Sequence, residues 1–381
     1  MIKQRIGILG GGQLGRMLFL EGSPRGFQIS MMDQSASFPG GQVCPNFMEG
    51  DFTVFEDVVR FGTTVDTITI EIEKINTEAL KELEQSGKTV FPQPTVIEMI
   101  QDKGLQKKFY QNNGFATAPG IECKDLTELT SKVKNGTIVL PVVQKMRRGG
   151  YDGRGVHVIH TASDLDQAFE KDFILEEAID IEKEISVITC RNPQGQIVMY
   201  DAVEMIFNEE NNILSHQLAP ATIQEEIDQE ARQLALAITQ KLQIVGLLAI
   251  EMFLTKDGRI LVNEMAPRPH NSGHHTIEAC WTSQYENHLR AITSSPMGHV
   301  DLHHKSILLN LLGEPGYEGP AKYQGLEEAF ESPGVFVHIY GKEITKPFRK
   351  MGHVNILADS HDKLDVLFRL VQNNLKVISG N

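Results

Sequence analysis

Short apolar runs alternate with longer amphipathic stretches over the first part of the chain. The runs at residues 5–10, 27–33 and 66–73 predict strands, and the stretch from Met17 to Glu21 predicts a helix after the first run. Strands that alternate with helices indicate a parallel sheet. Because the proline-rich segment VFPQPT interrupts the pattern near residue 95, we expect a first domain over residues 1–96.

The pattern changes after residue 96, where several strand-like runs follow one another. Helices are predicted around residues 97–112, 125–134 and 225–243, and strands at 137–145, 156–159, 173–179, 184–190 and 197–205. We expect a second domain over residues 97–295, with a flap subdomain at about 112–177. A third unit at 296–381 carries predicted strands at 306–313 and 335–342 and a last helix at 361–374.

The strongest local signal is a predicted hairpin within residues 246–273. Two apolar segments flank Asp257 and Gly258, which predicts a two-residue type I′ turn. In that register Lys256 faces Arg259, and the register decides which side chains meet across the two strands.

Counting outward from this turn places Glu251 directly opposite Glu264. Opposed side chains on paired strands lie about 4.5–5.5 Å apart, and like charges at that distance repel. The neighbours expected on the same face, Phe253 and Val262, are apolar, so the two carboxylates need a shared proton or a cation. Oxygen ligands that leave positions open for phosphate suit Mg²⁺.

Length, charge and cysteine content narrow the class of protein. With 381 residues the chain exceeds the usual size of a single core, and its net charge of −14 argues against nucleic-acid or anionic-membrane binding. Charged residues interrupt every hydrophobic run, and the N-terminus has no signal-peptide pattern. The four cysteines are scattered, as is typical of reduced thiols, so we expect a cytoplasmic protein.

A glycine run at residues 10–15 fits the pattern GxGxxG between a predicted strand and a helix. Asp33 follows at the spacing of an acid that binds the ribose of a dinucleotide. The run itself reports only a tight turn and a helix N-terminus open to an anion. A dinucleotide site, a phosphate or substrate cradle, and a purely structural turn therefore all remain open.

A second glycine-rich run follows Lys145 and extends to Gly155, with Arg147, Arg148 and Arg154 adding positive charge. It lies between two predicted strands, which excludes a Walker-type loop at a helix start. A strand-to-strand flap with this composition can close over a polyphosphate. The alternative is a long hairpin whose glycines only turn the chain.

Two further segments have a functional and a structural interpretation. The backbone at 176–179 can bind an adenine edge with Glu184 near the ribose, or this acidic stretch is solvated surface. Arg268, stiffened by two prolines, can bind a planar oxyanion together with His270 and Asn271, or it packs in a loop. The spacing of the histidines at 270, 274 and 275 does not favour zinc, because no cysteine or further histidine stands at ligand spacing.

Positive charge is also concentrated near the C-terminus, in Tyr340-Gly341-Lys342 and in residues 346–353. Within an acidic protein such a cluster indicates a phosphate site, and a solvated basic turn is the alternative.

The motifs GGGQLGRM, GGYDGRG, NEMAPRPHNSGHHTIEAC, YGK and RKMGH, in this order, resemble the ATP-grasp superfamily and, within it, the N5-carboxyaminoimidazole ribonucleotide synthetase family. The resemblance implies a mixed α/β and α+β fold: a parallel-sheet pre-ATP-grasp domain, an ATP-grasp domain and a small C-terminal domain. It implies ATP and Mg²⁺ as cofactors, bicarbonate and 5-aminoimidazole ribonucleotide as substrates, carboxyphosphate as the intermediate and a homodimer.

The resemblance also implies roles for individual residues. ATP would be bound by the two lysines, the flap, the adenine segment and the end of the hairpin: Lys103, Lys145, Gly150, Tyr151, Asp152, Gly153, Arg154, Gly155, Glu176, Glu177, Ala178, Ile179, Glu184, Asn263 and Glu264. Glu251 and Glu264 would hold Mg²⁺. The catalytic residues would be Arg268, His270, Asn271 and Asp152. The first three would bind bicarbonate or carboxyphosphate, and Asp152 would lie near the substrate amine. The ribonucleotide would contact Gln13, Glu73, Tyr151, Asp152 and Arg154, with its 5′-phosphate at Lys342, Arg349 or Lys350.

Two departures from the family pattern and three rival functions accompany this interpretation. Lys103 stands where an arginine is common, and an inserted-looking KPF before RKMGH leaves the choice between Arg349 and Lys350 open. The rivals are another ATP-grasp ribonucleotide ligase, an NAD-dependent oxidoreductase and a silent nucleotide-binding regulator. The last two leave both metal carboxylates without a role.

Overall fold

The N-terminal part of the protein is built on a five-stranded parallel sheet. The computed structural model describes residues 4–150, 155–208 and 213–380. The sheet has the order β3-β2-β1-β4-β5, and its strands are β1 (Arg5–Leu9), β2 (Gln28–Asp33), β3 (Phe47–Glu49), β4 (Thr67–Ile70) and β5 (Thr89–Val90). The parallel sheet predicted from the sequence is therefore confirmed.

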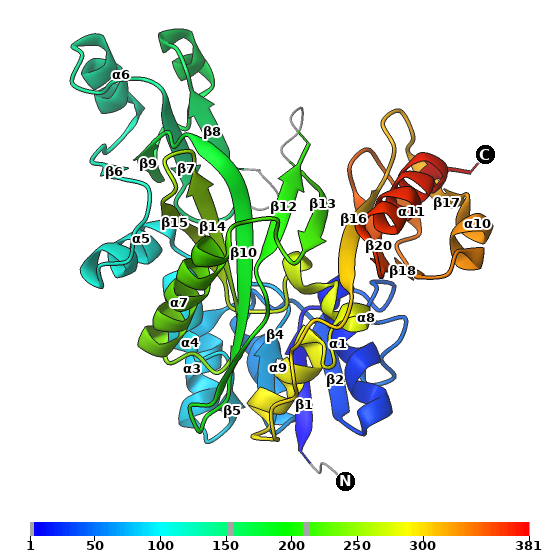
Figure 1. Ribbon diagram of the computed structural model, residues 1–381. Helices are drawn as coiled ribbons and strands as arrows, with labels where there is room; N and C mark the ends of the chain where they lie inside the picture. The colour runs from blue at the N-terminus through cyan, green and yellow to red at the C-terminus, as the bar shows by residue number, and fades with distance from the viewer. Residues whose placement is uncertain (1–3, 151–154, 209–212, 381) are drawn as a thin grey trace.

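Four helices belong to this region, which is blue to cyan in Figure 1: α1 (Gln13–Gly22), α2 (Phe55–Thr63), α3 (Thr77–Gln85) and α4 (Pro94–Ile100). Strand β4 ends at Ile70 rather than at residue 73 as predicted. Glu71 and Glu73 therefore lie just beyond the carboxyl end of a strand, where parallel sheets usually bind ligands.

A small four-stranded antiparallel sheet carries the predicted flap. Its order is β6-β9-β7-β8, with β6 (Gly120–Ile121), β7 (Val142–Met146), β8 (Val156–Ile159) and β9 (Phe173–Glu177). It is joined by α5 (Lys103–Asn112), α6 (Leu126–Lys134) and a 3₁₀ helix, η2 (Ala162–Gln167). Figure 1 shows α6 and this sheet projecting at one end of the molecule. Strand β7 begins at Val142, five residues later than predicted.

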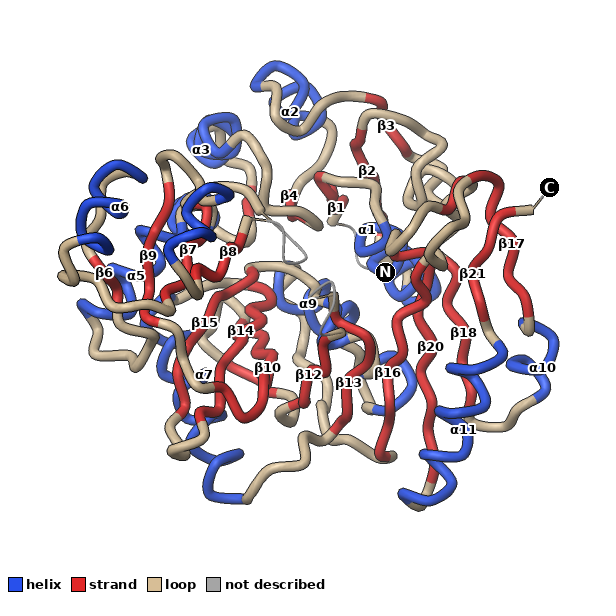
Figure 2. Tube along the Cα trace, turned by 90° about the horizontal axis from the view of Figure 1, so that it is seen from above, coloured by secondary structure: helices blue, strands red, loops and turns tan. Residues whose placement is uncertain are grey.

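A nine-stranded antiparallel sheet forms the remainder of the framework. Its order is β15-β14-β10-β12-β13-β16-β20-β18, with β11 paired to β10. The strands are β10 (Ile181–Arg191), β11 (Ile197–Met199), β12 (Val203–Phe207), β13 (Leu214–Ala219), β14 (Gly246–Thr255), β15 (Ile260–Ala266), β16 (Lys305–Leu312), β18 (Val335–Ile339) and β20 (Lys350–Ala358). Because β13 pairs with β16, one sheet runs past residue 296 into the C-terminal region, as Figure 2 shows from above.

The C-terminal region adds a three-stranded sheet and two helices. The strands are β17 (Gly319–Gln324), β19 (Ile344–Thr345) and β21 (Lys376–Ser379), and the helices are α10 (Leu326–Glu331) and α11 (His361–Asn374). The bounds of α11 equal those predicted from the sequence. The Gly341 carbonyl accepts a hydrogen bond of 2.7 Å from Gln42 Nε2, which joins this region to the N-terminal domain.

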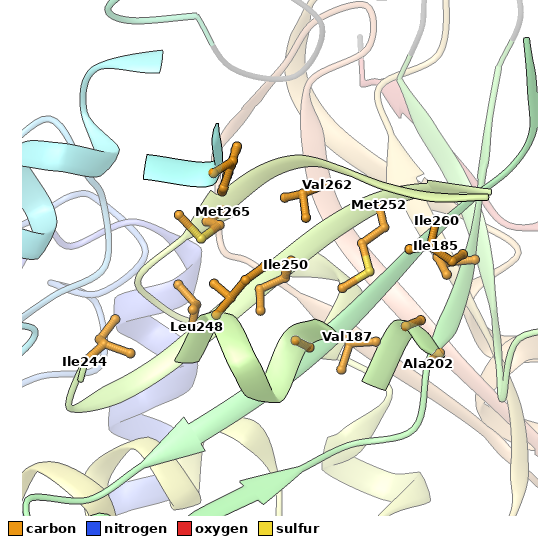
Figure 3. Packing of buried hydrophobic residues seen from close by; sticks show 14 of the residues in the cluster. Ile185, Val187, Ala202, Ile244, Leu248, Ile250, Met252, Ile260, Val262 and Met265 are labelled. Carbon is orange, nitrogen blue, oxygen red and sulfur yellow. The ribbon is translucent and has the colours of Figure 1, made fainter. Parts of the chain in front are cut away.

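The largest buried hydrophobic cluster among the described residues includes one face of the predicted hairpin. Side chains of β10, β14 and β15 pack there against α7 (Glu225–Leu242), and Ile250, Met252 and Met265 are among them (Figure 3). Two helices, α8 (Thr276–Ala279) and α9 (Gln284–Ile292), follow the hairpin, and α9 packs against β10 and β14. Burial of apolar area is the main source of stability at such a site, so the hairpin is a rigid platform.

No helix within the described parts of the chain is long and apolar enough to cross a bilayer.

Candidate active site

The turn of the hairpin differs from the predicted one. Thr255, not Lys256, faces Arg259: the Thr255 amide donates to the Arg259 carbonyl at 2.9 Å. The loop is therefore three residues long, and only its last residue, Gly258, has a positive φ (82°). A type I′ turn needs positive φ at both central residues, so that prediction is wrong. The strands leave the turn one residue out of the expected register.

A β-bulge restores the register further along the strands. Met252 pairs with Val262, but Glu251 pairs with Glu264, so Asn263 is an extra residue in β15. The predicted pairing of the two glutamates is thus confirmed. Val262, predicted to lie beside them, belongs to the buried hydrophobic cluster instead.

The bulge also brings Asn263 to the same cavity as Glu264. Asn263 Oδ1 accepts a hydrogen bond of 2.8 Å from Lys145 Nζ, and Glu264 forms an ion pair with Lys103. A regular strand would place these two neighbours on opposite faces. The extra residue therefore places one more side-chain oxygen at this cavity.

The two carboxylates of the pair have different electrostatic surroundings, which shift their pKa values in opposite directions. Burial raises the pKa of Glu251, and the nearby charges of Glu264 and Glu184 raise it further. For Glu264, burial acts in the same direction, but the charge and hydrogen bond of Lys103, together with the charges of Lys145 and His270, hold the pKa of Glu264 below its usual value. In this structure Lys103 is thus the cation that the repelling pair requires.

This donor set fits Mg²⁺. The carboxylates of Glu251 and Glu264 and the Oδ1 atom of Asn263 are oxygen donors of the kind that Mg²⁺ prefers. Glu184, on β10 opposite Phe253, belongs to the same group of charges. Burial and the charge of Glu264 raise the pKa of Glu184 to about 7 against the opposing effect of Lys145.

Glu176 joins the lysines on the other side of the cavity. Its buried carboxylate lies 2.6 Å from Lys107 Nζ and 2.8 Å from Lys145 Nζ. The Glu176 side chain is therefore the counterion of these two lysines. The predicted adenine-binding backbone continues from it through Glu177, Ala178 and Ile179. The Glu177 amide itself donates to the Pro119 carbonyl at 3.0 Å.

Lys107 also lines this cavity, although the sequence did not lead us to predict it as a site residue. It stands four residues after Lys103, so the two side chains lie on the same face of α5, and this spacing is the signal that could have indicated it.

The flap lies between two strands, as predicted. The Met146 amide donates to the Gly155 carbonyl at 2.7 Å, and Gly149, Gly150 and Gly155 all have positive φ. Tyr151, Asp152, Gly153 and Arg154 lie outside the described residues. At the root of the flap, the buried Asp102 carboxylate binds Arg147 Nε at 2.7 Å and Arg148 Nε at 3.3 Å and also caps α5, which begins at Lys103.

The predicted anion site is next to the carboxylate pair. His270 Nε2 lies 3.2 Å from Glu251 Oε1, and Arg268 Nε lies 2.8 Å from Glu73 Oε1. Asn271 Nδ2 donates to Asn310 Oδ1 at 3.1 Å, across the junction with the C-terminal region. The structure thus joins Glu73, which follows β4, to the loop after β15.

The histidines that follow are engaged in other contacts. His274 Nδ1 lies 2.8 Å from the Tyr285 hydroxyl, and His275 Nδ1 lies 3.1 Å from the Ser272 carbonyl. Among the residues that the structure describes, no three histidine, cysteine or acidic side chains are grouped as metal ligands.

The first glycine run binds the protein's own carboxylates. Glu71 accepts hydrogen bonds of 2.8 Å from the amides of Gly12 and Gly15, and Asp33 accepts one of 2.7 Å from Gly11. The anion at the start of α1 is therefore Glu71. Asp33, which the dinucleotide interpretation assigned to a ribose, is bound to the turn itself, so the structure favours the structural interpretation of this motif.

Gln13 is the first residue of α1. It therefore lies at the same edge of the parallel sheet as Glu71 and Glu73.

The basic residues near the C-terminus donate to backbone carbonyls of the same region. Lys342 Nζ donates to the Lys350 carbonyl at 2.6 Å, while Arg349 Nη1 donates to the Ile344 carbonyl at 2.7 Å. The charge of Lys350 lowers the pKa of Glu251, against the dominant effect of burial.

Comparisons with known proteins agree with this arrangement. Family models match over most of the chain: a ribonucleotide synthetase preATP-grasp domain at residues 3–101, an ATP-grasp domain at 108–285 and a phosphoribosylaminoimidazole carboxylase C-terminal domain at 306–366. The N5-carboxyaminoimidazole ribonucleotide synthase of Bacillus subtilis is 37% identical over 363 residues, which cover 94% of this chain and 92% of that protein. The chain belongs to the N5-carboxyaminoimidazole ribonucleotide synthase family.

Solved structures of this family have the same fold. The N5-carboxyaminoimidazole ribonucleotide synthetase of Thermotoga maritima superposes with a TM-score of 0.90 at 40% identity, covering 99% of this chain and 100% of that one. The Aspergillus clavatus synthase, in complex with ADP and 5-aminoimidazole ribonucleotide, superposes with a TM-score of 0.87 at 28% identity, covering 98% and 100%. The predicted ATP-grasp fold, with its parallel N-terminal sheet and small C-terminal domain, is thus confirmed.

Proposed function

We propose that this chain is an ATP-dependent ligase that joins bicarbonate to 5-aminoimidazole ribonucleotide and forms N5-carboxyaminoimidazole ribonucleotide. Family membership supports the reaction, since the Aspergillus clavatus relative is complexed with ADP and this ribonucleotide. The observation that carries the proposal is the contact between His270 and Glu251, at 3.2 Å, beside Glu264 and Lys103. This contact supports a proposal in which bicarbonate binds beside the Mg²⁺ that carries the ATP phosphates.

In the first step an oxygen of bicarbonate attacks the γ-phosphorus of ATP, the bond to the β-phosphate oxygen breaks, and ADP leaves. Mg²⁺ held by Glu251 and Glu264 would neutralise charge on the phosphates. Lys103 and Lys145 bind the same phosphates, because their ammonium groups already converge on this cavity. The products are ADP and carboxyphosphate.

In the second step the exocyclic amine of the ribonucleotide attacks the carboxyl carbon and inorganic phosphate leaves. The amine loses one proton, for which Asp152 is the proposed acceptor. Arg268, His270 and Asn271 hold the carboxyphosphate by charge and hydrogen bonds. A guanidinium suits this role because its fork matches a planar oxyanion.

Recognition of the nucleotides follows from the same layout. The backbone of residues 176–179 would bind adenine and Glu184 the ribose of ATP. Gln13, Glu73 and the flap residues Tyr151, Asp152 and Arg154 would contact the second substrate. Its 5′-phosphate would lie among Lys342, Arg349 and Lys350, at the junction of the N- and C-terminal regions.

The wider organisation belongs to the same proposal. We infer domains at residues 1–96, 97–295 and 296–381, a cytoplasmic location and a homodimer. Analytical ultracentrifugation tests the last point, and a single species at the monomer mass of 42.5 kDa would contradict it.

Phosphate release tests the reaction. With ATP and Mg²⁺, release should require both bicarbonate and 5-aminoimidazole ribonucleotide for full rate. Glycinamide ribonucleotide with formate serves as the control pair for another ligase of this fold. Stimulation by that pair, with no response to the aminoimidazole, would overturn the assignment.

A further inference from the structure

His270 is held at both its backbone and its ring. The carboxamide of Gln284 makes two hydrogen bonds to the His270 backbone. The His270 amide donates to Gln284 Oε1 at 3.0 Å, and Gln284 Nε2 donates to the His270 carbonyl at 2.7 Å. Gln284 is fully buried at the start of α9. The position of the His270 backbone is therefore fixed by a helix outside the loop.

The ring is oriented through its Nδ1 atom. The Ser272 amide donates to His270 Nδ1 at 3.3 Å, and Ser272 Oγ lies 2.9 Å from the same atom. A backbone amide has a hydrogen to donate and no lone pair to offer, so Nδ1 must be the acceptor. In a neutral imidazole the hydrogen then resides on Nε2. That is the nitrogen that lies 3.2 Å from Glu251 Oε1, at the edge of the proposed anion site.

A second serine supports the first. Ser186 Oγ lies 2.9 Å from Ser272 Oγ, and both residues are buried, with exposures of 1% and 0%. Ser186 is on β10 directly opposite Glu251 on β14. The contacts therefore form a closed path from the strand beside Glu251, through both serines and the imidazole, back to the Glu251 carboxylate. Such a path fixes the ring relative to the carboxylate pair.

We propose that Ser272, supported by Ser186, is a positioning residue that presents His270 as an Nε2–H donor to the anion bound beside Glu251. This inference rests on the proposed function, in which that anion is bicarbonate and then carboxyphosphate. An anion with negative oxygens needs donors around it, and a hydrogen on Nε2 serves that need while a lone pair there would repel. His270 thus binds and orients the anion together with Arg268.

The tautomer of wild-type His270 is the first test. Protein with ¹⁵N-labelled histidine rings is examined with Mg²⁺ and ADP bound, and the His270 signals are assigned by their loss in His270→Asn. The expected result is a hydrogen on Nε2 and a bare Nδ1. A hydrogen on Nδ1 would overturn the inference whatever the variants show.

Kinetics of Ser272→Ala give the second test. The kcat/KM for bicarbonate should fall about tenfold, because the ring loses the Ser272 Oγ contact and keeps only the backbone amide at Nδ1, while KM for ATP is unchanged. Ser186→Ala should reduce kcat/KM less. Ser306→Ala is the matched control, because Ser306 is equally buried and its Oγ has no hydrogen-bond partner among the described residues. It should behave as wild type.

Two outcomes count against the inference and are separable from failure of the function. If Ser272→Ala keeps wild-type kcat/KM for bicarbonate while Arg268→Ala loses it, Ser272 has no positioning role and the anion site stands. An equal rise in KM for ATP in Ser272→Ala would also overturn it, since a general structural defect acts on both substrates. If neither variant alters the response to bicarbonate, the proposed function itself fails.

Discussion

Glu73 and Arg268 form an ion pair with 2.8 Å between Glu73 Oε1 and Arg268 Nε, although 194 residues separate them in the chain. Glu73 follows β4 of the parallel sheet, and Arg268 follows β15 of the large antiparallel sheet. Both side chains are largely buried. Arg268 Nη1 also donates to the Pro269 carbonyl at 2.9 Å. The N-terminal domain therefore helps to hold a guanidinium of the proposed anion site in place.

Glu73→Gln should therefore weaken bicarbonate binding without unfolding the protein. The ion pair is replaced by a neutral contact, and Arg268 loses its orientation. We expect KM for bicarbonate to rise roughly tenfold, with KM for ATP unchanged. Steady-state phosphate release at varied bicarbonate measures this. Glu78→Gln, at an exposed ion pair with Lys81, is the control and should have wild-type kinetics.

Arg268→Ala should cost more than loss of the Glu73 carboxylate. Because the guanidinium itself is removed, carboxylation should fall on the order of 10²-fold or more. Formation of the carboxylated product, measured with labelled bicarbonate, is the readout. Arg268→Lys retains the charge but not the fork, and we expect it to recover only part of the activity. Unchanged kinetics in Arg268→Ala would contradict the proposed anion site.

Glu264→Gln should abolish turnover while the protein remains folded. The substitution removes a proposed Mg²⁺ ligand and the partner of Lys103, so the loss should be on the order of 10²-fold or more. Circular dichroism and phosphate release at high Mg²⁺ measure the two properties. Glu204→Gln, at an ion pair of 2.9 Å with Lys183 away from the cavity, is the control. Full activity of Glu264→Gln would eliminate the metal hypothesis.

Glu71→Ala should destabilise the N-terminal domain. The buried amide of Gly15 and the partly buried amide of Gly12 lose their acceptor, which should lower the free energy of unfolding by about 2–4 kcal/mol. Urea denaturation measures it, and Glu71→Gln, which keeps one acceptor oxygen, should lose less. NAD⁺ should leave Tm unchanged, since Glu71 occupies the turn, whereas ATP with Mg²⁺ should raise it. A stabilising effect of NAD⁺ would restore the dinucleotide interpretation.

Buried histidines should destabilise the protein below neutral pH, because they gain a proton on unfolding. Burial lowers the pKa of His288 to about 3 and that of His275 to about 4, from an ordinary value of 6.5. Above pH 6.5 both states are neutral, and below it only the unfolded chain binds the proton. The histidine contribution to the free energy of unfolding should therefore decrease as pH falls from 6.5, by at most about 1.4 kcal/mol per pH unit for each group, while the raised pKa of Glu184 acts in the opposite direction.

Urea denaturation between pH 5 and 8 measures this slope. His288→Gln should reduce it, because its buried titratable group is gone, while His160→Gln at an exposed position should not. A slope unaffected by His288→Gln would show that His288 is not the group concerned.

Much of this protein was determined by local sequence. Apolar runs were sufficient to predict the parallel sheet, helix α7 and helix α11, because period and length are local properties. The pairing of Glu251 with Glu264 was also predicted, although the count from the turn reached it through two errors that cancel. The three-residue loop shifted the register by one, and the bulge at Asn263 shifted it back. Neither the φ angles of a turn nor a bulge is specified by apolar pattern alone.

Tertiary structure decided the contacts between distant segments. Glu71 fills the glycine turn from 56 to 59 residues away, and the path from Ser186 to Ser272 spans 86 residues. Glu73 meets Arg268 only because a loop of the first domain lies against the end of the large sheet. Sequence supplied the residue types that suit phosphate and bicarbonate. Which carboxylate faces which amide, lysine or imidazole depends on side chains converging from separate sheets, and that convergence exists only in the folded chain.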